Sequence, residues 1–370
     1  MTLGVVLLAA VCTFGAAANA ETEQCSSVAL RDGDTVIFGA NLDHVTVSAG
    51  LVFVHPRGLE KTSWWAGTTG DFARWTSRYA SVTFNLVGYP FAWAWMNDQG
   101  LTLSTMSLGA TQVPAPDERP PLDSGEWMQY LLDTCQTVED VIASDARVRI
   151  FTVDHYLVAD RFGGVAVIEF LDGDMVVHDG DDLPTTVLTN SPYAESATTW
   201  LTFRDLGRYT WLGGSLARFC LAADRIAAYQ PTRREAAIAY VFDTLDVIRG
   251  QDFSEHTSQW NLVFDTSALR AYFRTFDHRE IKNVDLNAFN LRCENPVQML
   301  DIQEPTPGDV GPFFFDFSYD LNFAHTLEFM QAWGSNISSE ALDRMLRHHT
   351  SCPCVTARPR HVSDRRVAAP

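Results

Sequence analysis

CSSVALRDGDTVIFGANLD, residues 25–43, describes a β-hairpin that opens on a cysteine. A short strand leads into a polar turn at residues 31–34, and an apolar strand returns from it. The returning strand carries residues 39–43 back beside Cys25. We therefore expect the Asp43 carboxylate to lie close to the Cys25 thiol.

An uncharged leader precedes this hairpin. Residues 1–20 carry no charged side chain and end in Ala18-Asn19-Ala20, a small-x-small cleavage pattern. The stretch is too short and too rich in small residues for a good membrane span. We expect a cleaved signal peptide over 1–20, with an uncleaved anchor as the alternative, and a short pro-segment over 21–24. The mature protein is then expected to be secreted or periplasmic.

Removal of residues 1–24 makes Cys25 the first residue of the mature chain. A terminal cysteine carries a thiol nucleophile and a free α-amine on one residue, and such an amine titrates near neutrality. The amine can therefore act as the base that activates the adjacent thiol. This pattern predicts a covalent catalyst.

The charge of the chain restricts its partners. The net charge is −19, which argues against nucleic acid or an anionic membrane as a partner once the leader is gone. No second long apolar run and no natural linker follow the leader, so we expect one domain over 25–350. The Arg-, Pro- and Ala-rich end, residues 351–370, is expected to be a disordered tail.

Seven cysteines become six when the leader is removed, an even count for a secreted chain. Cys135 and Cys220 fall on apolar faces of predicted helices, where free buried cysteine is common. A pair or two of the remainder is expected to be bridged, and the spacing does not say which. The His348-His349 and Cys352-Pro353-Cys354 group fits no common zinc pattern. A disulfide or exposed residues are favoured there, and no metal or cofactor is expected.

The order of predicted elements indicates the fold class. After the hairpin we expect strands and helices at the following positions: strands at 81–87 and 101–108, a helix at 125–144, a hairpin of 155–159 and 165–171, two helices between 217 and 248, and strands at 258–265 and 269–276. Strands, then helices, then strands again predict an α+β fold of antiparallel sheets covered by helices. Two aromatic groups, residues 64–65 and 89–95, are typical of core but also suit an apolar pocket.

Common catalytic signatures such as G-x-S-x-G, H-E-x-x-H and the Walker loop are absent from the sequence. Four other motifs occur in order: the hairpin of residues 25–43, MNDQGL at 96–101, VLTNSP at 187–192, and YFRTFD at 272–277 leading into KNVDL at 282–286. In that order and spacing they resemble the choloylglycine hydrolase family, which includes conjugated bile salt hydrolases and penicillin V acylases. The resemblance runs from Cys25 to about residue 291.

This resemblance implies the N-terminal nucleophile fold, an αββα sandwich of two antiparallel sheets between helical layers. It also implies hydrolysis of linear, non-peptide amide bonds without a cofactor, on a small-molecule acyl amide. Members are often tetramers, so the resemblance makes a homotetramer an assembly state to test.

The resemblance implies a role for five residues. Cys25 matches the nucleophile, and Asp43 matches the acid that holds the amine and thiol in place. Asn190 matches the asparagine that binds the oxyanion, a contact that contributes roughly 3 kcal/mol. Arg218 matches an arginine of the charge network, and Ser107 aligns where relatives shape the oxyanion hole. Taken singly, each has an ordinary alternative: a turn or cap for Asp43, a turn for Asn190, and a surface position for Arg218.

Ala40 departs from the family pattern, because many relatives carry an arginine there. Its loss is expected to raise the thiol pKa and to weaken binding of anionic groups. The leading hypothesis is a cysteine amidohydrolase acting on penicillin V-like or N-acyl homoserine lactone substrates, with bile salts as a further alternative. A non-catalytic binding protein of the same fold, and a secreted domain with Cys25 in a disulfide, are the rival interpretations.

Overall fold

A computed structural model describes residues 25–33, 35–43, 49–66, 70–152, 154–231, 233–249 and 258–355. The signal peptide and pro-segment predicted over 1–24 lie outside these residues, as does the predicted tail from residue 356 onward. Residues 351–355 belong to the fold, because Cys354 forms a disulfide with Cys293. The Glu60 backbone N–H also donates to the Pro353 carbonyl oxygen at 2.9 Å.

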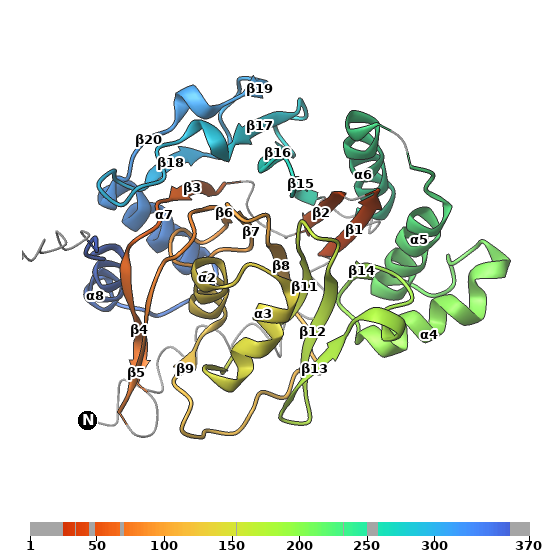
Figure 1. The fold of residues 1–370 in the computed structure, drawn as a ribbon, viewed down its shortest axis with the longest axis horizontal. Coiled ribbons are helices and arrows are strands. Elements are labelled where there is room, and N and C mark those ends of the chain that lie inside the picture. The colour runs from red at the N-terminus through yellow and green to blue at the C-terminus, as the bar shows by residue number, and fades with distance from the viewer. Residues whose placement is uncertain are drawn as a thin grey trace, which may run out of the picture.

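Two large sheets form the centre of the protein (Figure 1). The first consists, in spatial order, of β14 (Val187–Leu188), β1 (Ser26–Asp32), β2 (Thr35–Asp43), β15 (Ser258–Asp265), β16 (Arg270–Thr275), β17 (Lys282–Asp285) and β19 (Gly308–Asp309). The second consists of β13 (Asp174–His178), β12 (Val165–Leu171), β11 (His155–Ala159), β8 (Thr102–Met106), β7 (Ala94–Asn97), β6 (Ser81–Asn85), β3 (Leu51–His55), β18 (Gln298–Asp301) and β20 (Phe315–Asp316). All pairs are antiparallel except β17 with β19.

Two small ribbons, seven α-helices and five short 3-10 helices make up the rest of the regular structure among the described residues (Figure 1). The ribbons pair β4 (Glu60–Ala66) with β5 (Phe72–Thr76) and β9 (Pro121–Leu122) with β10 (Arg149–Ile150). The helices are α2 (Ser124–Thr134), α3 (Val138–Ile142), α4 (Tyr193–Phe203), α5 (Gly214–Ala228), α6 (Arg234–Ile248), α7 (Tyr319–Ala332) and α8 (Ser339–Thr350). No helix among the described residues is long and apolar enough to cross a bilayer.

Helices cover the outer face of each sheet. One core cluster joins residues of α5 and α6 to both sheets, and another joins α2 and α3 to the second sheet. Helix α6 packs directly on β2. The contact is so close that a Cβ atom added at Gly39 would come within 2.4 Å of the Val241 side chain. The glycine permits this close approach of helix to strand. The predicted α+β sandwich of two antiparallel sheets between helical layers is confirmed.

The opening hairpin forms as predicted but is longer. Strand β1 pairs with β2 from Ser26 opposite Asn41 to Asp32 opposite Thr35. Gly33 in the turn has a left-handed φ of 61°, which glycine adopts without steric cost. Because β2 also pairs with β15 on its other edge, its regular structure continues to Asp43. The two edges together fix where the residues beside Cys25 lie.

The predicted helix at 125–144 is wrong in extent, because the chain breaks it in two. Helix α2 ends at Thr134, and a capping box starts α3: the Thr137 side chain accepts from the Asp140 N–H, and the Asp140 carboxylate accepts from the Thr137 N–H. The buried Asn97 amide satisfies the freed Leu132 and Cys135 carbonyl groups. Cys135 is buried, as expected of a free cysteine there.

The aromatic groups belong mainly to the core. Tyr89, Trp93 and Trp95 are buried in three different clusters. Trp64 packs edge-on against His348 of α8. The interpretation as core is therefore confirmed for Tyr89, Trp93 and Trp95, whereas Trp64 is partly buried at the edge of a cluster.

Candidate active site

Cys25 lies directly before β1, where the hairpin brings it against the end of β2. The residue is only 4% exposed. The Sγ atom lies 4.0 Å from the Asp43 carbonyl oxygen, within reach of a weak S–H donor. The hairpin thus brings the Asp43 backbone to the Cys25 thiol. The proximity of the Asp43 carboxylate to that thiol stays a prediction. Cys25 forms no disulfide with another described cysteine, contrary to the rival interpretation in which it is bridged to one of them.

Arg218, on α5, links the start of β1 to the loop that carries Asn190. Its Nε donates to the Ser26 hydroxyl at 3.2 Å, and Nη2 donates to the Cys25 carbonyl at 3.5 Å. Nη2 also donates to Asn190 Oδ1 at 2.9 Å. With 4% of its surface exposed, Arg218 is not the surface residue of the alternative interpretation. It is a permanently charged guanidinium next to the candidate nucleophile.

The start of α5 places this arginine. Gly213 and Gly214 both adopt positive φ, 57° and 48°, and turn the chain sharply into the helix. Residues with a Cβ adopt such angles at a cost, so the pair of glycines suits this turn. Arg218 follows one helical turn later and points toward the sheet.

Asn190 lies in the four-residue link between β14 and α4. Its Nδ2 donates to the Ser107 carbonyl oxygen at 3.1 Å. Because Arg218 occupies the amide oxygen, the amide nitrogen must face the Ser107 side. An amide nitrogen has two hydrogens, so it can serve Ser107 and an oxyanion together. Hydrogen bonds thus connect four residues in a line: Cys25, Arg218, Asn190 and Ser107. We call these four residues the Cys25 chain.

Hydroxyl groups flank Asn190 on both sides. Thr189 Oγ1 lies 2.9 Å from the Ser215 hydroxyl, and Ser191 Oγ donates to the same hydroxyl at 2.9 Å. Across the two sheets, the Ser27 hydroxyl of β1 meets the Ser104 hydroxyl of β8 at 2.5 Å. These contacts tie together the elements that carry the candidate site.

Ala40 is fully buried on β2, opposite Ser27 on one side and Leu262 on the other. It belongs to the same core cluster as Cys25. The position where the family resemblance led us to expect an arginine is therefore an apolar contact in this chain. The cation that contacts Cys25 in the described residues is Arg218, which donates to the Cys25 carbonyl oxygen.

The structure adds two residues that the sequence motifs did not reveal. Ser26 accepts from Arg218, and it was hidden as an ordinary strand residue beside the cysteine. Glu169 is a fully buried carboxylate on β12 that accepts from the Tyr193 N–H at 3.0 Å. The signal for Glu169 was a single charge inside the apolar run VAVIEFL, since such a charge is costly without partners.

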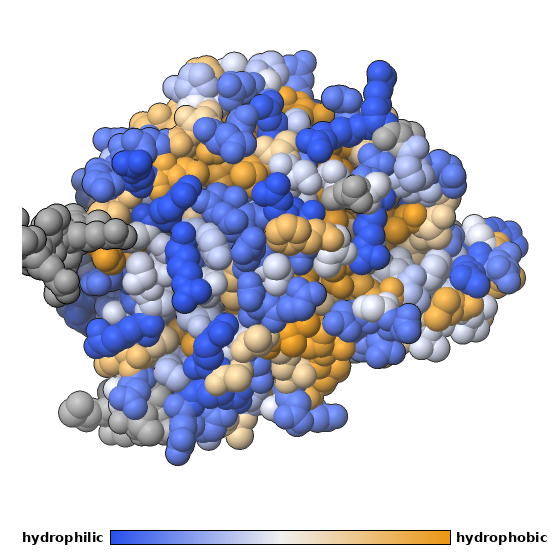
Figure 2. Space-filling model, viewed as in Figure 1, coloured by the Kyte–Doolittle hydropathy of each residue, from blue (hydrophilic) through white to orange (hydrophobic). Residues whose placement is uncertain are grey.

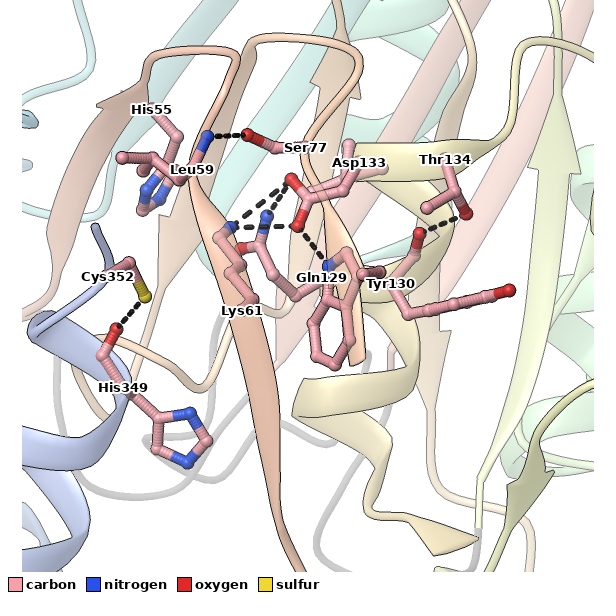
Figure 3. A network of polar contacts seen from close by, with 12 residues as sticks. His55, Leu59, Lys61, Ser77, Gln129, Tyr130, Asp133, Thr134, His349 and Cys352 are labelled. Carbon is pink, nitrogen blue, oxygen red and sulfur yellow. Dashed lines mark hydrogen bonds and ion pairs between the residues drawn. The ribbon is translucent and has the colours of Figure 1, made fainter. Parts of the chain in front are cut away.

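A second buried polar cluster lies between β4, β5 and α2 (Figure 3). The Asp133 carboxylate pairs with Lys61 Nζ at 2.9 Å and accepts from Gln129 Nε2 at 2.9 Å and Trp75 Nε1 at 2.7 Å. Nearby, the Cys352 thiol donates to the His349 carbonyl oxygen at 3.1 Å. We call Asp133, Lys61, Gln129 and Trp75 the Asp133 cluster.

The His and Cys residues near the C-terminus do not gather as a metal site. Burial lowers the pKa of His349 to about 3. Among the described residues, Cys293, Glu294 and Cys354 lie close enough to share an ion. Their two cysteines are joined in the disulfide, so neither offers a thiolate.

A cavity of about 500 Å³ lies apart from Cys25, where the ends of the two sheets distant from β1 meet. Phe289, Leu291 and Phe314 line it together with Asp309 and Asp316. Both carboxylates are engaged locally, Asp309 by the Gly311 N–H and Asp316 by the Gln298 amide. This cavity shares no residue with the Cys25 chain.

Comparison with known proteins gives one family. The family model described as linear amide C–N hydrolases, choloylglycine hydrolase family, matches residues 25–211 and so begins at Cys25. A penicillin V acylase of Pectobacterium atrosepticum is 22% identical over 307 residues, which cover 70% of this chain and 78% of that protein.

Solved structures show the same fold. The penicillin V acylase from Agrobacterium tumefaciens superposes with a TM-score of 0.69 at 23% identity, covering 80% of this chain and 98% of the other. A cysteine-to-alanine mutant of the conjugated bile acid hydrolase from Clostridium perfringens superposes with a TM-score of 0.58 at 16% identity, covering 72% and 94%.

Proposed function

The chain belongs to the choloylglycine hydrolase family of linear amide C–N hydrolases, and on that premise we propose that it hydrolyses an acyl amide with Cys25 as its N-terminal nucleophile. One observation carries the proposal. The residue at which the family match begins is a buried cysteine, and Arg218 joins its backbone carbonyl group to Asn190.

Processing after Gln24 frees the α-amine of Cys25 in this mechanism. The amine takes the thiol proton as sulfur attacks the amide carbonyl carbon. The protonated amine then gives that proton to the leaving nitrogen as the C–N bond breaks, which leaves a thioester. Water, deprotonated by the same amine, attacks the thioester and releases the acid and the thiol.

The neighbouring groups stabilise charge that develops along this path. The Asn190 amide N–H and a backbone N–H near Ser107 hold the oxyanion, because donors fixed beforehand cost no reorganisation during reaction. Arg218 keeps Asn190 in the required orientation by holding its oxygen. The Asp43 carboxylate steadies the ammonium form of the α-amine.

Ala40 bears on the substrate. An alanine supplies no charge for an anionic group, so a conjugated bile salt is less favoured than an acyl amide with an aromatic or alkyl acyl group. The names of two relatives, both penicillin V acylases, support a penicillin V-like substrate first. N-acyl homoserine lactones are the second class to test.

A non-catalytic binding protein remains the competing function, and Ala40 is the observation that favours it. Experiments on the purified protein distinguish the enzyme from the binding protein. Intact mass and N-terminal sequencing, followed by a panel of acyl amides, should show a chain that begins at Cys25 and turns over. A chain beginning at Glu21 with no thiol-dependent turnover contradicts the enzyme.

Export and assembly are part of the proposal. The leader predicted over residues 1–20 supports secretion or a periplasmic location, which fractionation of expressing cells tests.

For assembly, Leu206 and Trp211 in the link between α4 and α5 are 61% and 57% exposed. In Figure 2, this end of the surface mixes hydrophobic and hydrophilic residues, and a continuous hydrophobic area lies over β12 and β13. Such exposure supports a subunit contact in a homotetramer, which native mass measurement tests.

A further inference from the structure

We infer that Glu169 is a positioning residue for the oxyanion-binding side of the site, an inference that rests on the function proposed above. Its Oε1 accepts from the Tyr193 backbone N–H at 3.0 Å and lies 3.0 Å from His155 Nδ1. Its Oε2 lies 3.3 Å from His178 Nε2. Glu169 and His155 are both fully buried.

The Tyr193 contact fixes one end of the loop that carries Asn190. Tyr193 is the first residue of α4, three positions after Asn190. The residue before it, Pro192, offers no side-chain cap to this helix. Glu169 supplies the missing acceptor from another strand, and its charge also suits the positive end of the helix dipole.

The other end of this loop is already fixed. Leu188 of β14 pairs with Ser27 of β1. Only residues 189–192 separate that pair from Tyr193, so the Glu169 contact leaves the loop little freedom. Two residues of α5 also hold side chains of this loop. Ser215 contacts Thr189 and Ser191, and Arg218 donates to Asn190.

The His155 contact reaches the Ser107 side of the same site. His155 begins β11 and lies opposite Met106, the last residue of β8. Ser107 follows Met106 directly and accepts from Asn190. One carboxylate therefore holds both elements that meet at the contact between Asn190 and Ser107.

The histidines keep this carboxylate ionised. Burial raises the pKa of Glu169, but hydrogen bonds from His155 and His178 outweigh it and lower the pKa to about 2. An ionised acceptor makes shorter and stronger hydrogen bonds than a neutral one. Since a misplacement of about 1 Å can cost about a hundredfold in rate, loss of this anchor should lower turnover.

The test compares Glu169→Ala, Glu169→Gln and Asp133→Asn in the processed protein, with penicillin V as the probe. Glu169→Ala should lower kcat by about tenfold or more and leave KM within about threefold, because the oxyanion contact acts in the transition state. Glu169→Gln keeps an oxygen for the Tyr193 N–H and should regain most of the loss. Alkylation of Cys25 by iodoacetamide forms no oxyanion and should keep its rate.

Asp133→Asn is the matched control, since Asp133 is an equally buried carboxylate with several donors outside the site. It should lower the unfolding midpoint without lowering kcat. A role for Glu169 in stability alone predicts that the two positions behave alike. A folded Glu169→Ala with kcat within about twofold of the unchanged chain would overturn the inference.

Two further measurements keep the test decisive. If Glu169→Ala does not fold, Glu169→Asp is tested instead. Aspartate keeps the charge, but its side chain is one methylene shorter, and an unchanged kcat in that variant overturns the inference.

If the protein without substitutions shows no turnover, the proposed function fails by itself. The side-chain amide signals of Asn190 in ¹⁵N spectra then decide: they should move in Glu169→Ala and not in Asp133→Asn, and the opposite result overturns the positioning role.

Discussion

Two buried polar groups in this protein look alike in composition and differ in arrangement. In the Asp133 cluster, one carboxylate receives Lys61, Gln129 and Trp75, and every donor converges on it (Figure 3). In the Cys25 chain, Arg218 donates to the Cys25 carbonyl oxygen and to Asn190, and Asn190 donates to the Ser107 carbonyl oxygen. The first arrangement converges on one carboxylate, whereas the second extends as a line of contacts from the residue proposed as the nucleophile. Burial of charge alone therefore does not indicate a reaction site.

The largest expected effect separates the two groups by activity. Cys25→Ser should lower kcat by about a thousandfold or more, because a hydroxyl is a far weaker nucleophile than a thiol next to the same base. Its fold should persist, since serine is nearly isosteric. Steady-state hydrolysis of an acyl amide measures the change.

Cys220→Ala is the matched control for that variant. Cys220 is a buried cysteine outside the disulfide, and burial and Asp224 raise its pKa to about 12, so its thiol is unreactive at neutral pH. Its replacement should leave kcat unchanged. Equal losses in both variants would mean that the thiol of Cys25 has no special role.

Asn190→Ala comes next. Removal of one oxyanion donor should lower kcat by about a hundred- to a thousandfold while KM changes little. Asn287→Ala, at an exposed position, is the control and should have no effect. A loss confined to KM in Asn190→Ala would place the residue in ground-state binding instead.

Asp133→Ala should act on stability and not on turnover. It leaves Lys61 buried without its ion-pair partner, which costs about 3–5 kcal/mol in unfolding free energy. Urea unfolding measures this, and kcat per folded molecule should stay the same.

A double variant sharpens the result. Lys61→Met combined with Asp133→Leu removes both charges and should recover much of that loss, because well-packed apolar residues often replace a buried pair without penalty. A fall in kcat that persists in the stable double variant would connect the Asp133 cluster to the reaction.

The smallest effect is a pH dependence of stability near α8. The pKa of His349 is about 3 in the folded chain because burial disfavours its charged form. The unfolded imidazole titrates near about 6.5, so between these values the unfolded chain binds one more proton. This contribution is fully present above about pH 6.5 and is lost as pH falls toward 3, at about 1.4 kcal/mol per pH unit.

His349→Gln should remove that slope. Urea unfolding of both proteins from pH 4 to about 7 compares them. Identical slopes would show that His349 carries a proton in the folded chain. Because the group lies outside the Cys25 chain, its replacement should leave the pH profile of kcat unchanged.

The sequence predicted the hairpin and its partners because the determinants there are local. A turn at 31–34 and two short strands decide how Asp43 returns to Cys25. The residues of the Asp133 cluster, in contrast, come from three separate elements, and nothing in the spacing of Lys61 and Asp133 indicates that they pair. The sequence showed Glu169 only as a charge in an apolar strand. It did not indicate that His155, His178 and Tyr193 contact that carboxylate.

The C-terminal part was the least predictable. Helices α7 and α8 were not expected. In α7, exposed apolar residues such as Leu321 blur the apolar face. In α8, Leu342, Met345 and Leu346 are buried at helical spacing, a signal that the sequence analysis missed. The disulfide joins Cys293 and Cys354 across 61 residues, a pairing set by packing and not by spacing. The break between α2 and α3 depended on a capping box that the apolar periodicity concealed.

The central claim is that Cys25, freed as the first residue, carries the acyl group during turnover. Acid quench of the processed protein during steady-state hydrolysis, followed by peptide mass analysis, tests this most directly. The account predicts an N-terminal peptide that begins at Cys25 and carries the mass of the acyl group, absent in Cys25→Ser. Turnover by a chain that still begins at Glu21, with no acyl group on Cys25, would contradict it.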